Sequence, residues 1–215
     1  MYEQETEFVC LGIKSKLVSL LAVTCSDNWI NNYVYLVFSI DSLPQFKSSA
    51  KQLLPLLCLV QLGKKLYKPF IILIFCELSK PKSAEIFLAD FVTEFSFLKK
   101  YGLFLNGIHF NIHAKVFFCN APVPEFIKSI KGHNAYYGCE RRIQKGECVD
   151  ISTAFLKVNS IRRTDAAFAC YEQEGHHKPE VVPLLLKLNI GHVSQFPLEY
   201  MHLVCLGATR RLLLH

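Results

Sequence analysis

The chain has 215 residues, of which 51% are hydrophobic and 20% are charged, and its formal net charge is +6. This composition excludes a wholly disordered chain and suits one domain, or one domain with an insertion. The acidic start and the odd count of nine cysteines argue against a secreted, disulfide-linked protein, so we expect reduced thiols in the nucleus or cytosol.

The first clear elements are three strands. Residues 1–32 stay unassigned apart from a helix-like apolar run at 11–23. Apolar, β-branched and aromatic residues, separated by turn residues, fill three segments: 33–40, 53–62 and 69–76. They predict an antiparallel meander with a turn at Gly63. A membrane span over 53–78 is the weaker alternative, because lysines and prolines interrupt that run.

A change of hydrophobic period marks a helix and then a fourth strand. Residues 83–101 have apolar side chains at helical spacing, with Ser83 as N-cap and Gly102 as C-cap. Residues 108–118 alternate with period two, so we expect their even-numbered side chains on one face. A strand after a crossover helix is usually parallel to a strand already in the sheet. The predicted fold class is therefore α/β with a mixed sheet.

Beyond residue 122 the pattern weakens. A short helix is expected at 124–130, followed by a polar, irregular insertion, and 181–188 and 200–214 are helical in character. Two adjacent histidines, His176 and His177, would point apart on any regular element. We therefore expect them to form a surface pair.

Two predicted strands end in a small polar side chain, Asp41 after the first and Asn120 after the fourth. If these strands are parallel neighbours, both positions lie at the same edge of the sheet. Two carboxylates at such an edge can share divalent cations such as Mg²⁺, which prefer oxygen ligands. Asn120 offers only a neutral carbonyl oxygen. From the pattern alone, an Asp41 that merely opens a turn is the simpler interpretation.

Two further groups have ligand chemistry. Cys139 suits a zinc knuckle, but the residue three positions later is Arg142, and the spacing of His133, Cys148 and His202 does not complete a standard ligand set. A free cysteine in a basic loop is the simpler interpretation. Glu199 would reach a metal from a helix, or it would favour the first turn of that helix through the helix dipole.

Six blocks occur in an order that resembles one family. IDSLPQFKSS (40–49), CNAP (119–122) and FIKSIKGHNAYYGCER (126–141) are followed by RTD (163–165), EGHH (174–177) and FPLEYMHLVCLGATRRLL (196–213). The blocks resemble IDGLPxFKSS, CDAPAR, FIKxxKGHNGYxGCERC, RTDxSF, EEHHxG and FPLDYMHLVCLGVxRKLL. These belong to animal transposase-domain proteins related to CACTA-type DNA transposons. The match runs from about residue 33 to 214.

This resemblance implies a ribonuclease-H-like transposase core whose acidic residues bind two Mg²⁺ or Mn²⁺ ions. Asp41 falls on the first acidic position, Asn120 on the second and Glu199 on a candidate third. Cys139 and His202 fall on zinc positions, with an incomplete ligand set. The implied organisation follows the blocks: an unassigned segment 1–32, a core at 33–131, an insertion with a degenerate zinc knuckle at 132–195, and a truncated core helix at 196–215.

Because the second acid is replaced at Asn120, the resemblance implies a decayed copy that does not cleave DNA. The alternative is a non-catalytic module that binds nucleic acid or protein, which its basic residues favour. A third alternative is a copy without cellular function that does not fold stably alone. The resemblance also implies DNA as the partner and the nucleus as the location, although the sequence shows no targeting signal, and we expect no membrane association.

Overall fold

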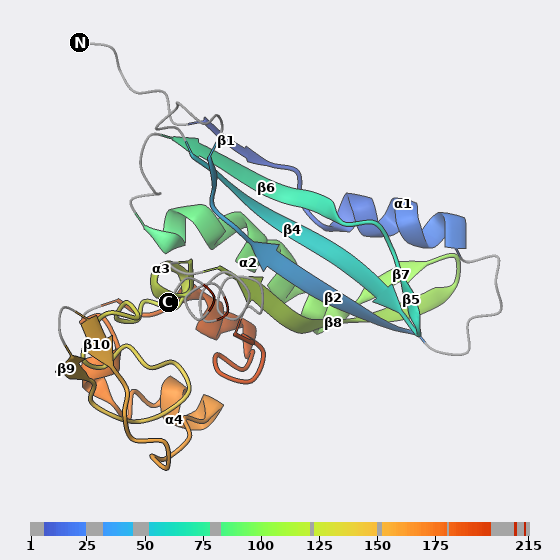
Figure 1. Ribbon diagram of the computed structural model, residues 1–215. Coiled ribbons are helices and arrows are strands. Elements are labelled where there is room, and N and C mark those ends of the chain that lie inside the picture. The colour runs from blue at the N-terminus through green and yellow to red at the C-terminus, as the bar shows by residue number, and fades with distance from the viewer. Residues whose placement is uncertain are drawn as a thin grey trace, which may run out of the picture. The chain divides into compact units, whose positions relative to one another are not determined.

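The computed structural model describes residues 7–24, 32–44, 52–77, 83–120, 123–149, 152–179 and 181–198, with positions 209 and 213. The chain forms two compact units, Met1–Phe118 and Cys119–His215. The first unit contains a large mixed sheet with two helices, and the second contains short helices and a two-stranded sheet (Figure 1). The α/β class expected from the sequence is therefore confirmed.

Three long antiparallel strands form the centre of the large sheet: β2 (Tyr33–Ile40), β4 (Gln52–Leu62) and β6 (Phe70–Glu77). β4 lies between the other two, with Val34 opposite Leu62 at one end of its pairing with β2. The turn after β4 contains Gly63 with φ 56°, a left-handed backbone that glycine adopts without strain. The predicted meander is confirmed, and the run considered as a membrane span contains β4, β6 and a short strand between them, β5 (Lys65–Leu66). Within the described ranges, no helix combines the length and apolar character that crossing a membrane requires.

The remaining strands of this sheet are short and lie beside the long ones. β1 (Glu7–Cys10) pairs antiparallel with β6, so part of the unassigned N-terminal segment joins the sheet. β3 (Leu43–Pro44) and β5 (Lys65–Leu66) pair with β4, and β7 (Leu103–Leu105) pairs with β8. The strand order along the sheet is β1-β6-β4-β2-β8-β7.

Helix α2 (Ala84–Tyr101) follows β6 and has the predicted caps. The Ser83 hydroxyl accepts a hydrogen bond from the Ile86 amide at 3.2 Å, and Gly102 ends the helix with φ 68°. Its apolar face packs on the sheet through an aromatic cluster, in which the Phe38 ring lies 5.1 Å from Phe91 and 5.3 Å from Phe95. These rings are fully buried. Their burial provides much of the hydrophobic stabilisation of the first unit.

β8 (Ile108–Cys119) lies next to β2 and runs parallel to it. The residue numbers of contacting pairs rise together along the two strands, as they do in a parallel pair. The Asn111 amide bonds the Asn32 carbonyl at 2.8 Å, and further along the rings of Phe38 and Phe117 stack at 4.7 Å. β2 and β8 therefore end at the same edge of the sheet, as the crossover rule predicts.

One predicted feature of β8 is wrong. Phe110 and Ile112 are buried as expected, but Phe117 is 1% exposed and Phe118 is 41% exposed. The buried side changes from even to odd positions between Lys115, whose ammonium bonds Gln61 at 2.7 Å, and Phe117. An extra residue of the β-bulge type produces such a change, because it reverses the alternation beyond it. The end of the expected face, at Phe118, is thus incorrect.

The second unit is built from short elements. After α3 (Val123–Ile127) come the hairpin strands β9 (Glu147–Val149) and β10 (Ser152–Ala154), helix α4 (Asp165–Ala169), and the 3₁₀ helices η1 (Glu174–His176) and η2 (Leu184–Leu188). The irregular character expected for this region agrees with these short elements. The helix expected at 200–214 lies almost wholly outside the described residues.

Candidate functional site

Asp41 and Asn120 each follow a long strand of the sheet, as the sequence predicts. Asp41 comes directly after β2, and Asn120 comes directly after β8 and belongs to the second unit. Each side chain has one buried oxygen, Oδ1, that makes no hydrogen bond to a described residue. Buried carboxylate and amide oxygens without partners are costly, and a bound cation or water satisfies them.

Glu199 and His202, the other two residues expected to act as ligands, lie outside the described residues. Cys139 is described and half-buried, and its sulfur lies 3.9 Å from the Gln144 amide nitrogen. In the parts of the chain that the structure describes, no three His, Cys, Asp or Glu side chains gather as a metal site would require.

Arg142 replaces the second cysteine of the expected zinc knuckle, and it has a structural role. Its guanidinium donates to the Ser160 carbonyl at 2.7 Å, and its backbone forms an antiparallel bridge with Arg162. The loop from Cys139 to Arg142, which a zinc ion would stabilise in a zinc knuckle, is therefore held by hydrogen bonds of Arg142. The alternative ligands His133 and Cys148 are both exposed.

A buried lysine lies in the second unit, and no sequence pattern indicated it. Lys128 is 2% exposed, forms an ion pair with Glu140 and donates to the His192 carbonyl at 3.1 Å. Its ammonium also lies 5.7 Å from the centre of the Phe168 ring and 5.1 Å from that of Phe196. Burial lowers the pKa of Lys128, and Glu140 opposes that shift. The ion pair and the aromatic faces compensate for the lost hydration of the charge.

Three histidines surround the same Phe168 ring, and the expectation of a surface pair at His176 and His177 is wrong. His176, His177 and His192 are 0%, 4% and 1% exposed. Their ring centres lie 6.2, 4.7 and 4.9 Å from that of Phe168. The pair is buried because the backbone of His177 bridges Ile130 and the His176 ring bonds the Tyr137 carbonyl at 2.7 Å. Only tertiary contacts between distant segments bring these groups inside.

All three histidines are held neutral. Burial lowers the pKa of His176 to about 3, and those of His177 and His192 to about 4. Arg163 and Lys128 add positive charge that lowers the pKa of His177 further. At neutral pH each ring therefore offers one hydrogen-bond donor and one acceptor.

Asp165, in the first turn of α4, fixes the segment after η2. Its Oδ1 accepts from the Val193 amide at 2.7 Å and the Ser194 amide at 3.0 Å, and its Oδ2 accepts from the Ser194 hydroxyl at 2.6 Å. Burial alone would raise the pKa of Asp165, but these hydrogen bonds outweigh burial and lower it. The aspartate of the RTD block thus has a structural role.

No protein-family model matches the chain, and no curated protein matches it. The ordered sequence blocks and the arrangement of the strands therefore provide the basis for a functional proposal. Of these, the decisive feature is that β2 and β8, the strands that precede Asp41 and Asn120, are neighbours in the sheet.

Proposed function

We propose that this chain is a transposase-derived, ribonuclease-H-like core that no longer cleaves DNA. The observation that carries the proposal is the strand order β6-β4-β2-β8, in which three antiparallel strands are followed by a helix and a strand parallel to the first. The family implied by the sequence blocks has this arrangement. Asp41 and Asn120 follow the two parallel strands, where that family has its first two acidic residues.

Asp41 fits a divalent cation, because its buried Oδ1 has no hydrogen-bond partner among the described residues. Mg²⁺ or Mn²⁺ would be held by Asp41 and Glu199, with a neutral oxygen from Asn120. In this family such ions stabilise the attacking and leaving oxygens during phosphodiester cleavage. Asn120 does not offset the charge of a cation, so its presence should cost several kcal/mol of transition-state stabilisation, on the order of a thousandfold in rate.

The first test restores the missing carboxylate. Asn120→Asp should tighten Mn²⁺ binding by about tenfold or more, because a second carboxylate joins Asp41. NMR spectra of the full chain would show paramagnetic broadening at the ends of β2 and β8 at lower Mn²⁺ concentrations than for the wild type. Asp90→Asn, a charge change at an exposed position on α2, is the control and should leave this broadening unchanged.

A DNA-nicking assay with Mg²⁺ or Mn²⁺ completes the test. The wild type should not nick DNA above background. Nicking by the wild type that Asp41→Ala abolishes would contradict the loss of activity, but not the ancestry. Broadening of Asn120→Asp that is centred elsewhere would contradict the ribonuclease-H-like arrangement itself.

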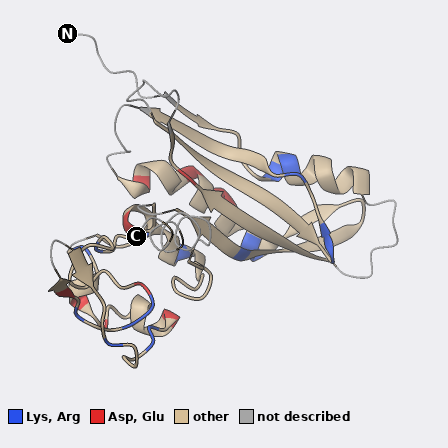
Figure 2. Ribbon diagram, viewed as in Figure 1, with Lys and Arg blue, Asp and Glu red and all other residues tan. Residues whose placement is uncertain are grey.

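A second candidate function is nucleic-acid binding without catalysis. Lys64, Lys65 and Lys68 are exposed around the turn between β4 and β5, where Figure 2 shows basic residues at the end of the ribbon. Exposed lysines so closely spaced can contact neighbouring phosphates. Two arginines elsewhere in the chain fit phosphate contact less well, since Arg163 is 5% exposed and the Arg142 guanidinium donates to a backbone carbonyl. The turn is therefore the proposed contact.

A further inference from the structure

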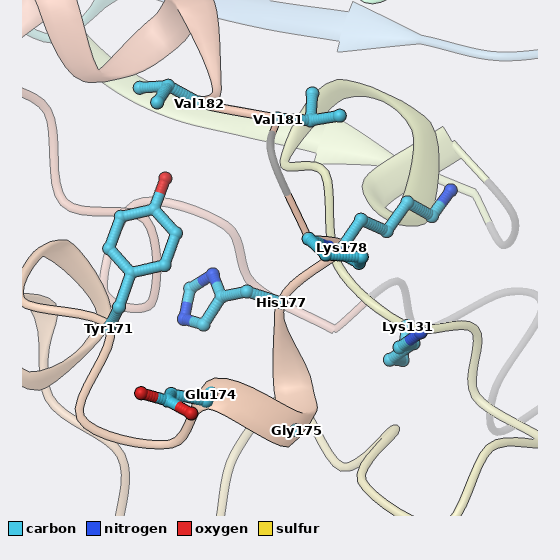
Figure 3. A pocket seen from close by; sticks show the side chains of 9 residues that line it. Lys131, Tyr171, Glu174, Gly175, His177, Lys178, Val181 and Val182 are labelled. Carbon is cyan, nitrogen blue, oxygen red and sulfur yellow. The ribbon is translucent and has the colours of Figure 1, made fainter.

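A cavity of about 620 Å³ lies in the second unit and is lined by residues of η1 and of the segments just before and after it (Figure 3). Its lining combines aromatic, charged and apolar groups: Tyr171, Glu174, His177, Lys131, Val181 and Val182. The volume falls in the range of small-molecule sites, which are typically 300–1,000 Å³.

The backbone holds His177 firmly at this cavity. The backbone of His177 forms an antiparallel bridge with that of Ile130. On either side of the bridge, the Lys131 amide donates to the His176 carbonyl at 2.7 Å and the Lys178 amide donates to the Ser129 carbonyl at 2.8 Å. The His177 side chain is therefore positioned by the fold before any ligand arrives.

The His177 ring has unused hydrogen-bonding capacity. Both ring nitrogens are buried, and neither has a partner among the described residues. The pKa of about 4 keeps the ring neutral at physiological pH, so one nitrogen donates and the other accepts. A group that occupies the cavity and both accepts and donates hydrogen bonds would satisfy the ring, since buried polar atoms are rarely left unpaired.

Tyr171 provides an aromatic surface beside this ring. The centres of the Tyr171 and His177 rings are 4.3 Å apart, and in Figure 3 the His177 ring points toward Tyr171. The Tyr171 hydroxyl is also buried without a partner in the described part of the chain. Tyr171 has φ 55°, a backbone conformation that is rare for a bulky residue and that often occurs at ligand sites.

We propose that this cavity binds a planar heteroaromatic ligand of the nucleobase class. A nucleobase offers hydrogen-bond donors and acceptors on its edge for His177 and Tyr171, and apolar faces for Val181 and Val182. The Lys131 ammonium would meet an attached phosphate. A free nucleotide and an unstacked base of a DNA strand share this chemistry. The proposal does not depend on the cation site at Asp41, which involves other residues.

The test is an NMR titration of the ¹⁵N-labelled full chain, including its histidine ring nitrogens. Four probes are compared: adenosine 5′-monophosphate, uridine 5′-monophosphate, ribose 5-phosphate, and a short single-stranded oligonucleotide. Binding of a nucleotide should shift signals of Tyr171, His177 and Val182, whereas ribose 5-phosphate should bind at least tenfold more weakly. If the oligonucleotide alone shifts these signals, the ligand is a base within a DNA strand.

Two exposed valines provide a matched pair of variants. Val182, which lines the cavity, is 73% exposed, and Val158, which does not, is 74% exposed. Val182→Trp should fill the cavity and weaken binding at least tenfold, whereas Val158→Trp should change it less than twofold. Tyr171→Phe removes only the hydroxyl and should weaken nucleotide binding several-fold. It tests the role of the cavity if Val182→Trp does not fold.

Three results would overturn the proposal. The first is the absence of any shift at His177 with up to 10 mM of either nucleotide and with the oligonucleotide, which would mean that only water satisfies the ring. The second is equal binding of ribose 5-phosphate and the nucleotides. The third is nucleotide binding that Val182→Trp and Tyr171→Phe leave unchanged.

Discussion

At the scale of single residues, the second unit contains a lysine in its interior, where the loss of hydration makes a charged group costly. Lys128 keeps its ammonium inside the unit with Glu140 as its ion-pair partner, while three histidines around the same aromatic ring are neutral. Burial lowers the pKa of the lysine and of the histidines alike, but Glu140 opposes this shift at the lysine. The lysine has a carboxylate within reach, and the histidines have mainly rings and carbonyls, so loss of the proton is the less costly state for them.

This difference predicts that acid destabilises the second unit. Unfolded histidines take up protons near pH 6.5, but the folded rings resist until about pH 4 or below, so the unfolded state binds more protons between these values. The unfolding free energy should therefore fall as the pH falls through this window. Between pH 7 and pH 5 each buried histidine should remove up to about 2 kcal/mol. Urea unfolding at both pH values measures the effect.

Two variants separate the buried rings from exposed ones. His192→Phe keeps an aromatic ring beside Phe168 and should shrink the loss between pH 7 and pH 5 by up to about 2 kcal/mol. His133→Asn, at an exposed position, should leave the loss unchanged. An unfolding free energy that is flat from pH 7 to pH 5 would show that these histidines are not held neutral.

At the scale of elements, Glu94 of α2 caps the start of helix α1 (Lys14–Thr24). Its two carboxylate oxygens accept hydrogen bonds from the amides of Ile13 at 2.8 Å and Lys14 at 2.9 Å. Gly12, just before them, has φ 72°, and a Cβ there would lie 3.1 Å from the carboxylate. A carboxylate at this position pairs free amides and meets the positive end of the helix dipole.

We expect Glu94→Ala to lower the unfolding free energy of the first unit by about 1–2 kcal/mol, because α1 loses its cap. Hydrogen exchange of the α1 amides should become about tenfold faster, with less change in β4. Asp90→Ala, at an exposed position on the same helix, should cost less than about 0.5 kcal/mol. Equal effects of the two variants would mean that the hydrogen bonds to α1 add nothing.

At the scale of the whole molecule, the proposed nucleic-acid binding through the turn between β4 and β5 can be separated from a diffuse effect of the net charge of +6. The triple change of Lys64, Lys65 and Lys68 to Gln should weaken binding to duplex DNA. It should also reduce the slope of log affinity against log salt by about 2–3, since each phosphate contact contributes about 0.9. Fluorescence anisotropy at several salt concentrations measures both quantities.

The control for this experiment removes the same charge elsewhere. Lys14, Lys16 and Lys187 are also exposed, and changing all three to Gln should reduce the affinity much less. If both triple variants weaken DNA binding equally, the net charge alone determines the affinity, and the turn between β4 and β5 is not the contact. Binding that does not depend on salt would argue against a phosphate-contacting surface altogether.

The local pattern of the sequence predicted most of the first unit. The long strands β2, β4, β6 and β8, the helix α2 with both caps, and the parallel relation of β2 to β8 follow from periodicity and from the handedness of crossover connections. The prediction from periodicity failed at Phe117 and Phe118, because an irregularity within a strand leaves no signal in the residue types along it. It also did not indicate β1, whose four residues become a strand only by pairing with β6.

The residue pattern alone predicted the α/β class and the strands that precede Asp41 and Asn120. Tertiary packing buries His176 and His177, places Lys128 in the interior and forms the cavity beside Tyr171, and no local pattern indicates these features. The physical reason is the range of the interactions. Periodicity and capping act within a few residues, whereas these groups are buried by segments tens of residues apart.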